Sequence, residues 1–288
     1  MVVENKQYVE HVEQTSAESY AKDTHKVVIV TGGASGIGLG LVQHYLSKGY
    51  VVAVFDITSK EDLSASQDPE LQSVISHPNT YFINTNIANN SSVQAAVKQV
   101  HNTLGAPHIV VNCAGILRAG PFTSLTADDF STSYQINVLG TRHLAAACLP
   151  LMRKGGRFAM VASMAGTVGI FGYTAYGSSK FAVLGFAQCL RAEYASTGIS
   201  ISVICPPEID TPMVVAETRT MHPATRILKG FAGRLTLDDA LPVMIKGISQ
   251  RRFMIIPGWQ AKMTFWLNRL TPIWLQNRVM DFLIKRHS

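Results

Sequence analysis

The chain has 288 residues, of which 47% are hydrophobic and 15% charged, so it can bury a large core and is neither disordered nor fibrous. Its formal net charge is +6, but residues 251–288 hold seven basic residues and a single acid, which leaves residues 1–250 neutral. A neutral body with a basic tail gives no support to a nucleic-acid partner.

The sequence shows no signal for export or for insertion into a membrane. No uninterrupted apolar run approaches the roughly 20 residues that a spanning helix needs. The first residues are rich in charge and contain no apolar core, so we expect no secretory signal. The four cysteines form no CxxC pair, have no histidine at metal-ligand spacing and lie in apolar contexts. We therefore expect buried, reduced thiols, no metal site and a cytoplasmic protein.

Residues 1–24 are polar and aperiodic, and we interpret them as a flexible arm. Beyond them, short runs of branched apolar residues alternate with longer amphipathic segments. The predicted strands are 26–31, 50–56, 81–84, 108–112, 157–162, 199–205 and 253–256, and the helical segments include 38–48, 91–104, 126–152 and 175–197. This alternation predicts an α/β fold in a single domain, residues 25–257, with a doubly wound parallel sheet of the Rossmann type.

The first predicted strand runs into a glycine-rich turn, 31–38, and a helix follows directly. Glycines allow the backbone to turn sharply and to approach a pyrophosphate, whose charge is stabilised at a helix N-terminus. The spacing is G-x-x-x-G-x-G, which differs from the usual G-x-G-x-x-G dinucleotide pattern. A tight strand–helix turn alone could also require these glycines, so the surrounding strand–helix–strand pattern strengthens the prediction of a dinucleotide site.

Asp56 ends the second predicted strand, 18 residues beyond Gly38. A carboxylate there can accept hydrogen bonds from the adenosine ribose hydroxyls and would repel a 2′-phosphate. Ile57 and Thr58 follow it, and no Arg or Lys is available at these positions for the extra phosphate of NADP. The sequence therefore favours NAD over NADP.

Tyr176 and Lys180 are four positions apart at the start of a predicted helix, so they share one helical face. A nearby ammonium favours the phenolate form and lowers the pKa of a tyrosine, which ordinarily lies at about 10. Such a tyrosine can donate and accept a proton near neutral pH. Ser163 follows the fifth strand, at the edge where open α/β sheets bind ligands, and its hydroxyl could donate a hydrogen bond to a substrate oxygen.

Taken together, these motifs resemble those of the short-chain dehydrogenase/reductase family, in its compact single-domain branch. The resemblance covers about residues 26–256 and rests on Thr31-Gly32-x-x-x-Gly36-x-Gly38, Asn112-Cys-Ala-Gly115, Asn137, Ser163, Tyr176-x-x-x-Lys180 and Pro206-Pro-x-x-x-Thr211. It implies that Tyr176 is the general acid/base, that Lys180 tunes it and binds the nicotinamide ribose, that Ser163 polarises the carbonyl, and that Asn137 holds a water linking Lys180 to solvent.

The resemblance also implies the residues that bind the cofactor. Asn112 and Gly115 would shape the adenosine side of the cleft, and Thr211 would contact the nicotinamide carboxamide. The expected cofactor-binding set is Gly32, Ser35, Gly36, Ile37, Gly38, Asp56, Asn86, Ile87, Asn112, Ala114, Gly115, Tyr176, Lys180, Pro206, Ile209 and Thr211.

Three positions depart from the family pattern. Cys113 replaces the usual second Asn, and Asn86 stands where an Asp commonly meets the adenine amino group, although its carbonyl can still accept a hydrogen bond. Pro207 replaces the glycine of the usual Pro-Gly and stiffens the entry to the substrate loop. That loop, from Met213 to about Lys229, is apolar, which is consistent with a hydrophobic substrate and also with a lid that packs on itself.

Residues 258–288 form a basic, tryptophan-bearing tail that we predict to be helical and amphipathic. In its first part, apolar residues recur at helical spacing: Trp259, Met263, Trp266, Leu267 and Leu270. After Pro272 a second stripe comprises Leu275, Val279, Phe282 and Leu283. Basic residues beside tryptophan suit a helix in a membrane interface, but such a stripe could equally pack on the body or on a partner subunit.

The leading hypothesis is an NAD(H)-dependent oxidoreductase that interconverts a secondary alcohol and a ketone of a hydrophobic, lipid- or steroid-like compound. An alternative within the family is a 3-ketosphinganine-type reductase, because the run 206–212 and the basic tail look similar to those of that group. Those reductases use NADPH, however, whereas Asp56 favours NAD. A non-catalytic dinucleotide-binding scaffold is the alternative from another class. We expect a homo-dimer or homo-tetramer with a small hydrophobic substrate, cytoplasmic or peripheral at a membrane surface.

Overall fold

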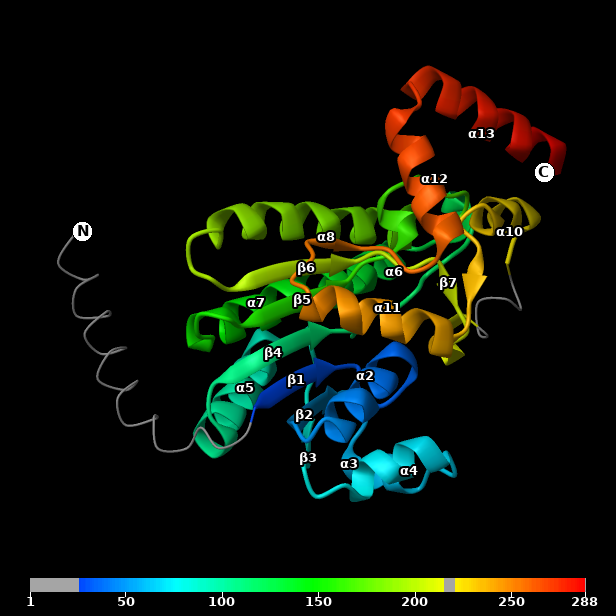
Figure 1. The fold of residues 1–288 in the computed structure, drawn as a ribbon. Helices are drawn as coiled ribbons and strands as arrows, with labels where there is room; N and C mark the ends of the chain where they lie inside the picture. The colour runs from blue at the N-terminus through cyan, green and yellow to red at the C-terminus, as the bar shows by residue number, and fades with distance from the viewer. Residues whose placement is uncertain (1–25, 215–220, 288) are drawn as a thin grey trace.

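The computed structural model describes residues 26–214 and 221–287. Seven parallel strands form one sheet in the order β3-β2-β1-β4-β5-β6-β9 (Figure 1). Their bounds are Val27–Thr31 (β1), Val51–Asp56 (β2), Thr80–Asn84 (β3), Pro107–Asn112 (β4), Arg157–Val161 (β5), Ser200–Ile204 (β6) and Met254–Ile255 (β9). Each lies within or beside one of the seven strands predicted from the sequence, which confirms the single-domain, doubly wound α/β fold.

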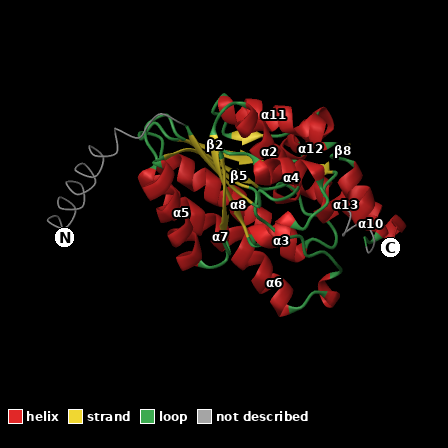
Figure 2. Ribbon diagram, turned by 90° about the horizontal axis from the view of Figure 1, so that it is seen from below, coloured by secondary structure: helices red, strands yellow, loops and turns green. Residues whose placement is uncertain are grey.

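Helices cover both faces of the sheet, which explains why its central strands are apolar on both sides (Figure 2). One layer contains α2 (Gly36–Ser47) and α11 (Leu237–Ser249), and α4 (Pro69–Ser76) extends it. The other contains α5 (Asn90–Leu104), α7 (Gly140–Cys148) and α8 (Thr174–Glu193). Every residue of β1 is buried because both faces of this strand are covered.

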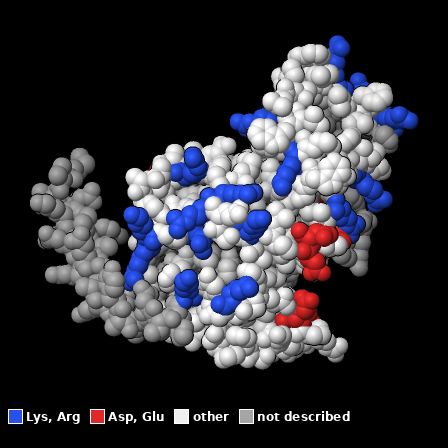
Figure 3. Space-filling model, in the orientation of Figure 1, with Lys and Arg blue, Asp and Glu red and all other residues white. Residues whose placement is uncertain are grey.

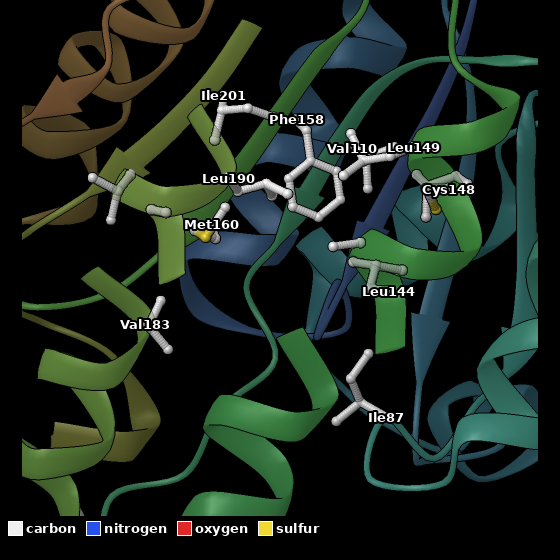
Figure 4. Packing of buried hydrophobic residues seen from close by; sticks show 14 of the residues in the cluster. Ile87, Val110, Leu144, Cys148, Leu149, Phe158, Met160, Val183, Leu190 and Ile201 are labelled. Carbon is white, nitrogen blue, oxygen red and sulfur yellow. The ribbon is translucent and has the colours of Figure 1, made fainter. Parts of the chain in front are cut away.

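Phe158 of β5 lies at the centre of the layer formed with α7 and α8 (Figure 4). Its strand register sets it beside Val110 of β4 and Ile201 of β6. Leu149 and Leu190 reach the same cluster from the two helical segments. This packing fixes α8, the helix that carries Tyr176 and Lys180, against the middle of the sheet.

The segment 126–152, predicted as one helix, is divided into four parts. It runs from α6 (Ala127–Ser133) through a π-helical turn, η3 (Tyr134–Leu139), into α7 and ends in the 3-10 turn η4 (Leu149–Leu151). Thr126 and Asp129 form a capping box at its start. The π-helical turn contains Asn137, whose side chain is buried, so the irregularity lies at a residue of the candidate site.

Several elements lie outside the segments that the sequence singled out. Short helices follow β2, β4 and β5; they are α3 (Lys60–Ser64), η2 (Phe122–Ser124) and η5 (Met164–Gly166), respectively. The predicted substrate loop contains a helix, α10 (Pro223–Gly230), and it is flanked by a two-stranded sheet of β7 (Glu208–Ile209) and β8 (Arg234–Leu235). Val215 and residues 216–220 of that loop lie outside the described residues.

The tail forms two helices, α12 (Trp259–Leu270) and α13 (Ile273–His287), which we call the C-terminal hairpin; it projects from the body beside α10 (Figure 1). Most of the stripe predicted on α12 does not pack on the body, because Trp259, Met263 and Leu270 are exposed. Trp266 is also more than half exposed, but one side of its ring lines a small cavity with Val243 and Ile256 of the body. The inner side of α12 consists instead of Ala261, Phe265 and Asn268.

In the described part of the chain, no helix is both long and apolar enough to cross a membrane. The predicted arm, residues 1–24, lies outside the described residues. The domain boundaries at residues 25 and 258 stay predictions, although β9 and the start of α12 agree with the second.

Candidate active site

The glycine-rich turn joins β1 to α2 at the carboxyl end of the sheet. Ser35 is the N-cap residue of α2, and Gly36 has a φ of +51°, which strongly favours glycine. A Cβ on Gly38 would overlap the carbonyl oxygen of Gly32. The turn is therefore a cradle that a side chain would fill, and it leaves the backbone amides at the start of α2 accessible to a pyrophosphate.

Asp56 lies at the end of β2, next to this turn. Its carboxylate accepts hydrogen bonds from the backbone amides of Ala34 (3.2 Å) and Thr58 (3.1 Å). These two contacts fix the orientation of the carboxylate beside the glycine-rich turn. Its contact with the ribose hydroxyls stays a prediction.

A buried chain of hydrogen bonds supports the wall between β1 and β4. Thr31 donates to Asn112 Oδ1 (2.5 Å), Asn112 Nδ2 donates to Thr141 Oγ1 (2.7 Å), and Thr141 donates to the carbonyl of Asn137 (2.6 Å). The Asn112 side chain lies behind the wall and does not line the cavity, so its role on the adenosine side of the cleft stays a prediction.

Asn137 joins two separate segments of the site. Its side-chain amide donates to the carbonyl of Ile116 (3.0 Å) and to Ser179 Oγ (2.9 Å), and its oxygen accepts from the Ile116 amide (2.9 Å). A Cβ on Gly115 would lie 3.1 Å from Asn137 Oδ1 and 3.3 Å from Lys180 Nζ. Asn137 thus positions the loop after β4 against α8, next to the lysine.

Tyr176 and Lys180 lie on the first turns of α8, and both are buried. The Lys180 ammonium lies 5.6 Å from the centre of the Tyr176 ring and donates a hydrogen bond to the carbonyl of Val161 (3.0 Å). Burial lowers the pKa of Lys180 from 10.5 to about 8. A buried lysine with a lowered pKa beside a tyrosine is typical of a functional site.

Ser163 follows β5 and begins the 3-10 turn η5, where its hydroxyl accepts a hydrogen bond from the amide of Ala165 (3.1 Å). The contact holds the serine oxygen at the carboxyl edge of the sheet, facing the same cavity as Tyr176. Tyr173 packs its ring edge-on against Tyr176, with the ring centres 5.3 Å apart. This packing restricts the orientation of the Tyr176 phenol.

One cavity brings together most of the predicted residues. Its wall includes Gly32, Ser35, Gly36, Ile37, Gly38, Ala114, Gly115, Ser163, Tyr176, Lys180, Pro206, Ile209 and Thr211. The predicted residues that do not line it are Asp56, Asn86, Ile87, Asn112 and Asn137. Residues separated by up to 180 positions thus meet at the carboxyl ends of β1, β4, β5 and β6, as in other open α/β sheets.

Asn86 and Ile87 are the predicted cofactor residues with the least support from the geometry. The Asn86 side-chain oxygen already accepts from the amide of Ala88 (3.0 Å) within its own turn. Ile87 is buried against α7, where its side chain would contact a Cβ at Gly140. The Asn86 side chain is exposed and the Ile87 side chain packs against α7, so contacts of these two residues with adenine stay predictions.

Three polar residues of the cavity wall were not identified from the sequence: Tyr173, Glu208 and Lys229. Lys229 of α10 forms an ion pair of 2.6 Å with Glu208 of β7, and its ammonium lies 5.8 Å from the centre of the Tyr173 ring. Both side chains of the pair are largely buried. Lys229 bounded the predicted loop, but only the fold reveals that it faces Glu208.

The four cysteines do not share one environment. Cys148 and Cys205 are buried as expected, and burial raises the pKa of Cys205 to about 12. Cys113 is half-buried and lines the cavity. The expectation was wrong for Cys189, which lies on the solvent side of α8. No group of three or more potential metal ligands occurs within residues 26–214 and 221–287.

Comparison with known proteins agrees with this geometry. Residues 26–222 match the family model described as short chain dehydrogenase. The chain belongs to the short-chain dehydrogenase family. A 3-ketodihydrosphingosine reductase of Mus musculus is 33% identical over 229 residues, which span 78% of this chain and 69% of the relative.

Two solved structures share the fold. A short-chain dehydrogenase/reductase from Burkholderia phymatum, solved with NAD, is 22% identical and has a TM-score of 0.71 over 86% of this chain and 93% of its own. ElxO with NADP bound is 24% identical and has a TM-score of 0.69 over 82% of this chain and 99% of its own. As a short-chain dehydrogenase, the chain is an NAD(P)-dependent oxidoreductase, and the glycine cradle and the Asp56 carboxylate fit such a dinucleotide.

Proposed function

We propose that this short-chain dehydrogenase interconverts a secondary alcohol and a ketone of a hydrophobic compound and uses NAD(H). The observation that carries the proposal is the position of Ser163, Tyr176 and Lys180 in one cavity, next to the glycine cradle. A scaffold that only bound a dinucleotide would have no need for these three side chains in one wall. The glycine cradle and Asp56 would hold the cofactor, which when bound would supply or accept the hydride.

The side chains of the chain handle the proton and the substrate oxygen. In reduction, the Ser163 hydroxyl donates a hydrogen bond to the carbonyl oxygen, and the Tyr176 hydroxyl transfers its proton to that oxygen as the carbonyl carbon becomes tetrahedral. The Lys180 ammonium, close to the Tyr176 ring, stabilises the phenolate that remains. In oxidation, the phenolate takes the proton from the alcohol.

Replacing Tyr176 with Phe tests the mechanism. It removes the proton donor and retains the ring that packs on Tyr173, so we expect turnover to fall about 10²- to 10⁴-fold while NADH affinity stays within about twofold. The exposed Tyr81 of β3, changed to Phe, is the distant control. Parental turnover by the Tyr176→Phe protein, measured by NADH absorbance with a set of hydrophobic ketones and alcohols, would refute the proposed role.

The cofactor preference is tested separately by titrating the enzyme with NADH and NADPH and following cofactor fluorescence. The fixed carboxylate of Asp56 predicts tighter binding of NADH, because a 2′-phosphate would approach a like charge. Tighter binding of NADPH would contradict this assignment and leave the reaction class intact.

A second candidate is a 3-ketosphinganine-type reductase. The similarity to a reductase with that substrate in its name favours it, and so does the cavity, where the Glu208–Lys229 ion pair lies among apolar residues such as Ile170, Met213 and Val214. Such a wall suits a ketone that has a polar end and an apolar chain. Turnover of 3-ketosphinganine is compared with turnover of a plain long-chain ketone of equal length. Only a 3-ketosphinganine-type reductase is expected to show a clear preference for 3-ketosphinganine.

A further inference from the structure

The C-terminal hairpin presents an unusually apolar surface to solvent. Trp259, Trp266 and Leu270 of α12 are 69%, 56% and 77% exposed, and the start of α13 adds Ile273 and Trp274 at 68% and 60%. Large exposed apolar side chains gathered on one pair of helices mark a site of interaction. Tryptophan in particular is enriched where proteins meet the interface of a lipid bilayer.

Nearly all charged residues of the C-terminal hairpin are basic. The hairpin carries five basic residues and one acid: Lys262, Arg269, Arg278, Lys285, Arg286 and Asp281. The view in Figure 3 shows basic side chains but no acidic ones on the projecting hairpin. Basic residues interspersed with tryptophan and aliphatic residues match the two attractions of an anionic lipid surface, apolar insertion and charge.

The hairpin is held firmly, so its exposed side has a fixed direction. Asn268 donates to the carbonyl of Thr167 (3.0 Å), and Thr264 donates to the carbonyl of Phe231 (2.7 Å). The connection between the helices is closed by Gln276, which donates to the carbonyls of Asn268 (2.6 Å) and Thr271 (2.7 Å).

These anchors place the hairpin at the rim of the active site. Thr167 follows the η5 turn that Ser163 begins, and Phe231 precedes Ala232, a residue of the cavity wall. α13 also packs beside α10, the helix that carries Lys229 into the cavity. A surface bound by the hairpin would therefore lie beside the substrate side of the cavity and far from the amino ends of the strands (Figure 1).

We propose that the C-terminal hairpin docks the enzyme on an anionic lipid bilayer, with the tryptophans in the interface and the substrate side of the cavity next to the lipid. A second copy of the chain is a poorer occupant, since a symmetric contact would oppose two faces of like charge. The docking itself is independent of the reaction, whereas entry of a lipid-like substrate from the bilayer rests on the proposed function.

The test is co-sedimentation of the full chain with vesicles of phosphatidylcholine alone and of phosphatidylcholine and phosphatidylserine in equal parts. We expect strong binding to the second vesicle only, weakened by added salt. Replacing both Trp266 and Trp274 with Ser, or both Arg269 and Arg278 with Glu, is expected to lower the bound fraction at least about tenfold.

Matched controls are Tyr81→Ser, an exposed aromatic residue on the opposite edge of the sheet, and Lys98→Glu, an exposed lysine on α5. Both should bind vesicles like the parent, and NADH binding should be retained in every variant. Tyr176→Phe must also bind vesicles normally, which separates failure of docking from failure of the proposed reaction.

Two results would overturn the proposal. The first is a parent chain that fails to sediment with anionic vesicles, and the second is a set of hairpin variants that sediment as the parent does. If the parent fails to sediment and a hairpin variant changes the mass in sedimentation equilibrium, the surface is an interface between copies.

Discussion

At the residue scale, burial changes the chemistry of Lys180 most. Its ammonium is removed from water and lies between the Val161 carbonyl and the Tyr176 ring. The pKa of about 8 means that the free enzyme neutralises Lys180 over a range in which an exposed lysine stays charged. Protonation of this residue is therefore coupled both to the proton chemistry of the site and to the stability of the fold.

This coupling predicts a pH-dependent stability difference between the parent and Lys180→Met. Because the folded pKa lies below the ordinary value of 10.5, the unfolded chain binds more protons between pH 8 and 10.5. The free energy of unfolding of the parent, relative to the variant, should rise with pH across that window and stay flat below it. Urea unfolding of both proteins without cofactor, from about pH 7 to about pH 10, measures it; a difference that falls with pH would contradict the assignment.

Asp56 and Ile57 allow a test of cofactor choice by substitution. Asp56→Asn removes the like charge that opposes a 2′-phosphate, and Ile57→Arg places a cation on an exposed side chain beside it. We expect the double variant to gain about tenfold or more in NADPH affinity and to lose NADH affinity, measured by fluorescence titration. Unchanged affinity ratios would show that the 2′-position lies elsewhere.

The sequence predicted the site residues that belong to compact motifs. Tyr176 and Lys180, or Gly36 and Gly38, are recognisable because a helix or a turn fixes their spacing. Tyr173, Glu208 and Lys229 were missed because their significance depends on contacts between distant segments, such as the ion pair between β7 and α10. No local pattern encodes such a contact.

At the element scale, the turn between β1 and α2 depends on the missing side chain of Gly38. We expect Gly38→Ala to weaken NADH binding more than about tenfold and to destabilise the fold, because the new Cβ meets the Gly32 carbonyl oxygen. Gly185→Ala in α8 is the matched control, since its Cβ meets no atom within 4 Å and alanine favours a helix. Equal NADH affinity in both variants would show that the turn tolerates a side chain.

Elements were predictable where one pattern dominates. Short apolar runs identified all seven strands of the main sheet, and the signal was clearest for β1 and β2, which are buried on both faces and almost continuously apolar. The break in 126–152 was not visible, since the π-helical turn is stabilised by the contacts of Asn137 with Ile116 and Ser179. The exposed stripe of α12 was equally ambiguous, because amphipathicity alone does not show which side of a helix faces the protein.

At the scale of the whole molecule, the neutral catalytic body and the basic hairpin occupy different places. The cavity draws residues from both halves of the sheet, while the hairpin lies at its rim and contributes none of the predicted catalytic side chains. Assembly into a dimer or tetramer stays a prediction. An interface between copies at the hairpin would cover the surface that we propose for the bilayer.

If the hairpin docks on a bilayer as proposed, its position beside the cavity determines which substrate concentration the enzyme responds to. A docked enzyme with a lipid-soluble substrate samples molecules per unit of bilayer area, so its rate follows their mole fraction in the lipid and is insensitive to the volume of buffer. Adding inert anionic vesicles at a constant total amount of substrate should then slow turnover by surface dilution. Measuring the rate against the amount of lipid added, at saturating NADH, distinguishes this behaviour from that of an enzyme that takes its substrate from solution. Under surface dilution, the composition of a membrane would regulate the activity without any ligand binding to the protein.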